Sequence, residues 1–385
     1  KTVYVRDAAN GMLLWQRSLR FPRPAKTPRW GWGETKFQDE TNFLAASGHV
    51  LFAVERYDED VTGLTWYNLE TGERLGEFAL PGVYQVLPVG ELVVAATSEE
   101  VVVITIDDEQ VRQVWRVGAQ PLDIRIADSR VHVLDRTVTP YRVVTLSLTD
   151  GEAQWMYDTA DVWPEGFDAD AKGVSQPVRL CGARDGRLLV WAARKRDPNS
   201  RSSHNDGDVL LCLDAETGKQ RWRYRPSREN DLHLGYANNV VHDRDVVYTL
   251  ALANVAFENR GKTERRRSQV QVVLDAKTGR ELRRTAIRIT NPMCQPAWCS
   301  PRFFTPRDHV LRADTLEDTG PPQIGRRAGC GVSSIAALGL TFNGSHVCSC
   351  GGGYQNFANI GMKSGSNSYR DPVAGINDEG ESIIE

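Results

Sequence analysis

The chain has 385 residues, of which 25% are charged and 41% are apolar, and its formal net charge at pH 7 is −3. This composition is typical of a soluble globular protein with a substantial core, and the near-balanced charge argues against a global affinity for nucleic acid or for an anionic membrane. No apolar run approaches the ~20 residues of a membrane-spanning helix, so we predict no transmembrane segment.

The first residues of the chain, 1–6, already have the pattern of a β-strand and carry no signal peptide. We therefore expect that a signal peptide has been removed and that the protein is periplasmic or extracellular.

A short pattern recurs along the chain: an apolar strand, Asp or a substitute, a Thr-Gly or Asn-Gly turn, and three residues later a Trp or another apolar residue. The clearest copy is Val209–Trp222. In chain order, the copies lie at residues 5–15, 66–75, 144–155, 209–222 and 272–282, and diverged copies lie at 103–115 and 313–318. Where the Asp-x-x-Thr-Gly stretch is kept, the Gly supplies a positive φ and the Asp and Thr side chains bind local amides, so the unit is a β-hairpin.

Further apolar strands, such as His49–Val54, Arg187–Trp191 and Asp245–Leu250, lie between the copies. Each period therefore holds about four strands, which is the content of one propeller blade. We predict an all-β protein, a seven- or eight-bladed β-propeller of four-stranded antiparallel blades. The propeller is expected to cover residues 1–350, and residues 351–385, rich in Gly, Ser and Asn and then acidic, are expected to form a loosely packed tail.

The tryptophan that ends several copies is predicted to be structural. Burying one indole removes ~150–250 Å² from water, so these side chains are expected to act as wedges between neighbouring blades. The predicted wedges are Trp15, Trp115, Trp155 and Trp222.

Insertions at residues 20–34, 194–207 and 257–267 interrupt the repeats, and propellers commonly place their function in such loops. Trp30 and Trp32 lie in the first insertion between Pro and Gly residues, where two indoles need a pocket or a partner. We predict a partner-binding loop around them, and solvated loops with incidental charge remain the alternative.

Seven cysteines are present, and Cys181 and Cys212 have strand contexts that indicate small core residues. The other five form a cluster near the C-terminal end: Cys294, Cys299, Cys330, Cys348 and Cys350. In an oxidising compartment this cluster would hold one or two disulfides, while free thiols and a zinc site stay open as alternatives.

The copy Asp214–Trp222 resembles the docking repeat of the β-propeller family with pyrroloquinoline-quinone (PQQ) type repeats. That family includes quinoprotein dehydrogenases and cofactor-free scaffolds such as the outer-membrane-protein assembly lipoprotein. The resemblance implies a fold more strongly than an activity. The adjacent Cys-Cys pair of the large quinoprotein enzymes is missing here, and no residue matches a quinone or calcium ligand by motif.

No catalytic constellation is evident in the sequence, so we predict a non-catalytic binding or scaffold propeller with a protein partner and without a cofactor. The alternative is a quinoprotein oxidoreductase that uses PQQ and calcium to oxidise alcohols or sugars.

Overall fold

A computed structural model describes residues 2–7, 12–20, 44–57, 61–107, 110–163, 177–193, 207–227, 232–235, 237, 240–259, 262–287, 298–299, 303–305, 311–317, 334–337 and 340–343. Within these residues the regular elements are β-strands, without any α-helix, so no described helix is long and apolar enough to cross a membrane. The predicted class, an all-β propeller, is confirmed. The number of blades stays a prediction, as does the domain boundary at residue 350.

The chain divides into two compact units, residues 17–291 with 1–3 and residues 4–16 with 292–385. At the N-terminus β1 (Thr2–Arg6) and β2 (Leu13–Ser18) form a two-stranded sheet. The second unit also contains a three-stranded sheet and a hairpin. Their strands are β24 (Trp298–Cys299), β25 (Phe303–Thr305), β26 (Leu311–Arg312), β27 (Ser334–Ala337) and β28 (Leu340–Asn343).

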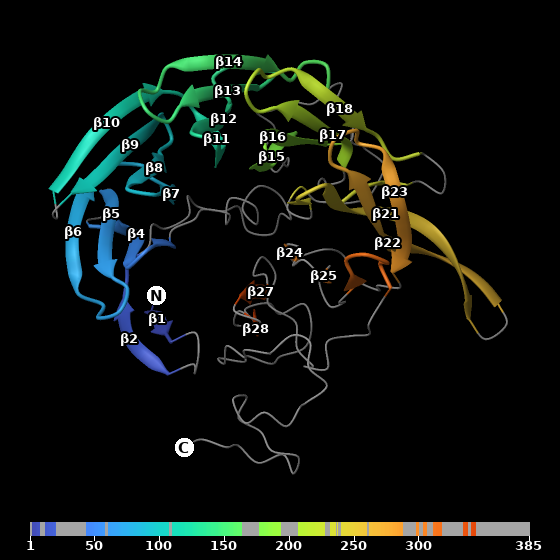
Figure 1. Ribbon diagram of the computed structural model, residues 1–385, viewed down its shortest axis with the longest axis horizontal. Helices are drawn as coiled ribbons and strands as arrows, with labels where there is room; N and C mark the ends of the chain where they lie inside the picture. The colour runs from blue at the N-terminus through green and yellow to red at the C-terminus, as the bar shows by residue number, and fades with distance from the viewer. Residues whose placement is uncertain are drawn as a thin grey trace, which may run out of the picture. The chain divides into compact units, whose positions relative to one another are not determined.

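In the larger unit, groups of four antiparallel strands follow one another in chain order (Figure 1). The first three sheets are β3 (Leu44–Ser47) to β6 (Arg74–Ala79), β7 (Gln85–Val89) to β10 (Gln110–Gly118), and β11 (Pro121–Ala127) to β14 (Ala153–Asp158). Their middle strands are β4 (Val50–Arg56), β5 (Thr62–Asn68), β8 (Leu92–Ala96), β9 (Glu100–Asp107), β12 (Arg130–Asp135) and β13 (Arg142–Ser147).

Two further groups of four belong to one larger hydrogen-bonded sheet. The fourth group is β15 (Val178–Arg184), β16 (Arg187–Ala193), β17 (Gly207–Asp214) and β18 (Gln220–Tyr224). The fifth is β20 (Val241–Asp243), β21 (Val246–Asn259), β22 (Lys262–Asp275) and β23 (Glu281–Ile287). Short β19 (His233–Leu234) joins them, because Leu234 pairs with Gly207 of β17 and with Ala251 of β21.

The middle strands of the second, third and fourth sheets are buried on both faces. Every residue of β16 is buried. Leu188, Val190 and Ala192 contribute to the core shared with the preceding sheet. Alternate residues Leu189 and Trp191 pack into the core shared with the following sheet. Because these three sheets are each covered by two neighbours, their middle strands have a continuous apolar run in place of the alternation expected of a strand with one solvent-exposed face.

The repeated turn has the geometry that its residues dictate. Asp214 Oδ1 accepts hydrogen bonds from the backbone N–H groups of Glu216 and Thr217, at 3.0 and 2.8 Å. Gly218 then adopts φ +70° and its N–H donates to the Asp214 carbonyl. Asp275 and Gly279 repeat this arrangement in the next sheet. The turns therefore have one conformation, in which the glycine has no side chain to occupy the space above it.

An indole ring from the preceding sheet fills that space. The Trp155 ring lies on Gly218, where a Cβ would be 2.5 Å from ring atom Cε3. Its Nε1–H donates to the Ala215 carbonyl at 3.1 Å. Trp115 repeats the contact on Gly151 with a bond to Leu148 O, and Trp222 repeats it on Gly279 with a bond to Ala276 O. Each of these three indoles thus joins the last strand of one sheet to the last turn of the next.

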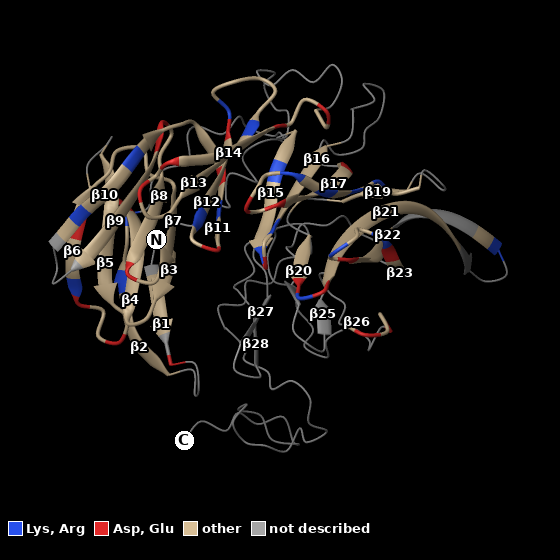
Figure 2. Cartoon of the chain, turned by 45° about the horizontal axis from the view of Figure 1, so that its top comes forward, with Lys and Arg blue, Asp and Glu red and all other residues tan. Residues whose placement is uncertain are grey.

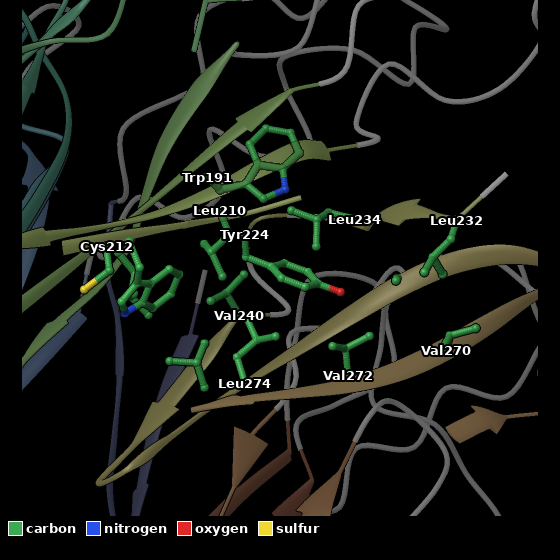
Figure 3. Packing of buried hydrophobic residues seen from close by; sticks show 14 of the residues in the cluster. Trp191, Leu210, Cys212, Tyr224, Leu232, Leu234, Val240, Val270, Val272 and Leu274 are labelled. Carbon is green, nitrogen blue, oxygen red and sulfur yellow. The ribbon is translucent and has the colours of Figure 1, made fainter. Parts of the chain in front are cut away.

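The core at the junction of the fourth and fifth groups contains several large aromatic side chains. Figure 3 shows Trp191 and Tyr224 among aliphatic residues from β17, β19 and β22. The Trp191 Nε1–H donates to the Gly235 carbonyl at 2.9 Å, and the Tyr224 hydroxyl donates to Glu281 Oε2 at 2.9 Å. Both buried polar atoms are therefore satisfied, as a buried hydrogen-bonding group requires.

We predict that Gly218→Ala lowers the free energy of unfolding by about 2 kcal/mol more than Gly90→Ala does. Both glycines have positive φ, +70° and +59°, so each Ala suffers a similar backbone strain of about 1 kcal/mol. Only at Gly218 must the new methyl displace an indole, and such overpacking costs ~1–3 kcal/mol. A Cβ at Gly90 meets nothing within 4 Å. Urea unfolding of both variants measures the difference, and equal losses would refute a role for the indole contact in stability.

Candidate functional site

The first strands of neighbouring sheets lie on the inner side of the larger unit (Figure 1), and buried charges join two of them. Asp123 on β11 is 3% exposed and Arg179 on β15 is 7% exposed. Arg179 Nε donates to Asp123 Oδ2 at 2.7 Å, and Arg125 Nη1 donates to Oδ1 at 2.9 Å. We call Tyr84, Asp123, Arg125 and Arg179 the inner ion cluster.

The electrostatics of the inner ion cluster fix Asp123 as a carboxylate. Burial opposes its ionisation, but the guanidinium groups of Arg125 and Arg179 outweigh this effect and hold the pKa of the carboxyl below its usual value. The Leu180 N–H adds a bond to Oδ2 at 3.2 Å. Tyr84 donates its hydroxyl to the Pro121 carbonyl, and burial together with the charge of Asp123 raises the pKa of this phenol.

This arrangement binds strands together and leaves little chemistry available. Both oxygens of Asp123 accept hydrogen bonds from guanidinium groups, which stabilise the ionised carboxylate and oppose its protonation. At the next junction Arg184 on β15 reaches Asp243 on β20 at 3.6 Å, in an ion pair that is more exposed to solvent. The inner charges therefore connect one sheet to the next.

Asp135, at the end of β12, is likewise a buried carboxylate held by several hydrogen-bond donors. Its carboxylate accepts bonds from the backbone N–H groups of Gln120 and Thr137, both at 3.1 Å, and from Arg142 Nε at 3.0 Å. Burial opposes ionisation of Asp135, yet these donors hold its pKa below the usual value. The carboxylate fixes the segment that leads into β11.

The residues that the sequence singles out are placed elsewhere. Trp115, Trp155 and Trp222 lie at the junctions described above, and Trp15 is half-buried in β2. Trp30 and Trp32 lie outside the described residues. So do Cys294, Cys330, Cys348 and Cys350, and for Cys299 only the backbone of β24 is described.

The two cysteines with described side chains are free thiols. Cys212 is fully buried, and this burial raises the pKa of its thiol to about 12. Cys181 is partly buried and packs against the same core. Both therefore act as small core residues, and the disulfide prediction for the C-terminal cluster lies outside the described residues.

Sequence reasoning did not find Asp123 or Arg179, because isolated charges in strands match no motif. One signal was available. In Pro121–Ala127 an Asp stands among alternating apolar residues, and an ionised group inside such a strand needs a partner. The partner, 56 residues further along, could not be identified from that pattern.

Comparison with known proteins identifies a family model that matches part of this chain. Residues 1–162 match the family model described as outer membrane protein assembly factor BamB. These residues are PQQ-type propeller repeats. The resemblance indicated by the repeat pattern is thereby confirmed. The matched stretch contains both Trp115 and the turn at Gly151 on which its ring packs.

Several solved structures are similar in fold to this chain. BamB from Moraxella catarrhalis is 12% identical, with a TM-score of 0.49, and the alignment covers 89% of this chain and 95% of that one. The quinohemoprotein alcohol dehydrogenase ADHIIG from Pseudomonas putida HK5 is 12% identical, with a TM-score of 0.48 and coverage of 90% and 67%. The N-terminal domain of Nup159 is 12% identical, with a TM-score of 0.45 and coverage of 85% and 96%. A search of curated proteins found no match.

A quinone held by calcium would require a set of oxygen ligands for the ion. Calcium takes six to eight oxygen ligands, several of them carboxylates. Among the described residues no group of three or more His, Cys, Asp or Glu side chains is placed to hold a metal ion. Asp123 is already bound by two guanidinium groups. We therefore assign no residue to a cofactor.

We predict that Asp123→Ala lowers the free energy of unfolding by about 3–5 kcal/mol, because it leaves the charge of Arg179 buried without its carboxylate. The double variant Asp123→Leu/Arg179→Met should lose less than the single variant, since the buried guanidinium group is removed together with its carboxylate and only the more exposed Arg125 loses its partner. Arg74→Ala, at the exposed pair with Glu77, should change stability by less than about 1 kcal/mol. Urea unfolding measures these changes. If Asp123→Ala lowers the free energy of unfolding no more than Arg74→Ala does, the buried ion pair does not stabilise the sheets.

A second prediction concerns His132, which is fully buried on β12. Its Nδ1 lies 2.8 Å from Thr145 Oγ1, and burial, assisted by Arg130, lowers the pKa of the imidazole to about 4. The unfolded chain, with an ordinary pKa near 6.5, binds the proton more readily between these values. His132 therefore reduces stability as pH falls from about 6.5 to 4, by about 3 kcal/mol in total.

The variant His132→Gln should remove this part of the acid sensitivity. The measurement is the free energy of unfolding at intervals from pH 7 to 4, with His49→Gln at an exposed imidazole as the matched control. Identical pH profiles for His132→Gln and the unaltered protein would show that the buried imidazole does not resist protonation.

Proposed function

We propose that this PQQ-repeat propeller is a non-catalytic binding or scaffold protein, a subunit of a larger periplasmic or extracellular assembly. The observation that carries the proposal is that the charged groups of the inner ion cluster are hydrogen-bonded to one another. The charges at the sheet junctions are bonded to one another, so they hold the sheets in place instead of facing a substrate.

The match of residues 1–162 to an assembly-factor family supports the same proposal. An assembly factor binds other proteins, and the predicted partner of this chain is accordingly a protein. A rigid set of sheets is well suited to such a role, because it presents loops at fixed positions with little loss of conformational entropy on binding.

The decisive test is calorimetric titration of the full chain with PQQ, in the presence and in the absence of calcium. We expect no saturable heat in either condition, because the described residues offer no free carboxylate set for the ion. The apoenzyme of a known quinoprotein dehydrogenase, titrated with the same solutions, is the positive control. Calcium-dependent binding near one equivalent would overturn the proposal and favour the quinoprotein oxidoreductase.

A further inference from the structure

A buried arginine at the start of β16 has no carboxylate partner in the described part of the chain. Arg187 is 8% exposed. Its Nη1 donates to the Asp185 carbonyl at 3.3 Å, and its Nε is buried without a hydrogen-bond partner among the described residues. A guanidinium group stays protonated in proteins, so Arg187 cannot avoid a buried charge by becoming neutral. Buried charges of this kind are normally paired.

The carboxylates around Arg187 are bonded to other arginines. Asp214 stands opposite Arg187 in the register of β16 and β17, but its Oδ2 accepts two bonds from Arg221, at 3.0 and 2.6 Å. Figure 2 shows acidic and basic residues together at the end of β20. There Arg184 forms two ion pairs, with Asp185 at 3.5 Å and with Asp243 at 3.6 Å. None of these ion pairs between described residues includes Arg187.

Arg187 and His242 face each other across the junction of the fourth and fifth groups. Leu189 and Trp191 of β16 pack into the core of this junction, and Arg187 lies on the same face of β16 because it precedes Leu189 by two residues. His242 on β20 stands opposite Val247, which belongs to the same core. Residues directly opposite each other on neighbouring strands share a face, so the side chain of His242 points toward the fourth group.

The imidazole of His242 has one nitrogen bonded and the other buried without a partner among the described residues. Nε2 lies 3.0 Å from the Arg244 carbonyl, which can only accept, so Nε2 carries a proton. Nδ1 is the buried nitrogen. Burial lowers the pKa of this imidazole, and the charges of Arg187 and Arg184 lower it further, while the bond to Arg244 and the charge of Asp185 oppose them. His242 therefore lies within the electrostatic field of Arg187.

We propose that Arg187 and His242 form a binding site for a small oxyanion, such as a carboxylate, sulfate or phosphate ion, between the fourth and fifth groups. The planar fork of the Arg187 guanidinium matches two oxygens of one such anion. His242, once protonated, donates to the anion from Nδ1. The anion thus supplies the negative charge that no described carboxylate provides to Arg187. This site is distinct from the inner ion cluster and goes beyond the scaffold function.

A small free anion fits these observations better than a metal ion or an acidic side chain of a partner protein. A permanent cation such as Arg187 repels a metal ion, and the carboxylates beside it are bonded to other arginines. The atoms without partners, Arg187 Nε and His242 Nδ1, are both buried. A small ion reaches such atoms with less displacement of the packed junction than a side chain attached to another protein does.

The experiment is calorimetric titration of the full chain with sulfate and, separately, with acetate, in a buffer free of other oxyanions. We expect saturable binding of at least one anion near one equivalent. Arg187→Met should weaken it about tenfold or more, since the charge-assisted bonds are lost. This variant removes a buried charge that lacks a carboxylate partner, so we expect it to fold. The matched control is Arg74→Met, which removes the same charge at an exposed ion pair and should leave binding unchanged.

The pH dependence of binding tests the role of His242. Sulfate and acetate keep their charge from about pH 8 to 6, whereas an imidazole gains a proton in or near this range. Affinity should therefore rise as pH falls, and His242→Gln should remove this rise. The other charged groups on this side of the junction are carboxylates and guanidinium groups, which ordinarily titrate outside this range: Arg184, Asp185, Arg187, Asp214, Arg221 and Asp243.

The titrations can contradict the proposal in three ways. Neither anion may bind saturably, Arg187→Met may bind as tightly as the unaltered protein, or the affinity may be the same at each pH. Either of the first two results would overturn the site, and the third would overturn the part assigned to His242. Binding of PQQ does not involve these residues, so failure here leaves the scaffold proposal intact.

Discussion

The contact of an indole ring with a glycine turn is the interaction on which the larger unit depends. It joins β10 to the turn after β13, β14 to the turn after β17, and β18 to the turn after β22. In each case the ring needs a turn without a side chain, and the turn needs an Asp or a related residue to fix its conformation. Because one sheet supplies the indole and the next supplies the glycine, no sheet can complete this contact alone. Stability is therefore a property of neighbouring repeats, as in other repeat architectures.

Charges complete the same junctions from the inner side. Asp123 with Arg179, and Arg184 with Asp243, connect first strands, while the indoles connect last strands to the turns beside them. Breaking a buried pair is expensive, so such pairs constrain which strands can lie together. This use of ionisable groups also bears on function. Groups that are consumed in holding sheets together are not available for catalysis, which is why we favour binding over chemistry.

The sequence by itself determined the repeat, the turn and the class of fold, because these depend on residues close together in the chain. Asp214, Thr217 and Gly218 specify a turn locally, and the copies at regular intervals imply a propeller. It did not determine that strands such as β16 are buried on both faces, since burial depends on what packs against a strand. Nor could it pair Asp123 with Arg179, or Arg184 with Asp243. Those features are set by contacts between distant segments, whose partners no local pattern specifies, and only the tertiary structure decided them.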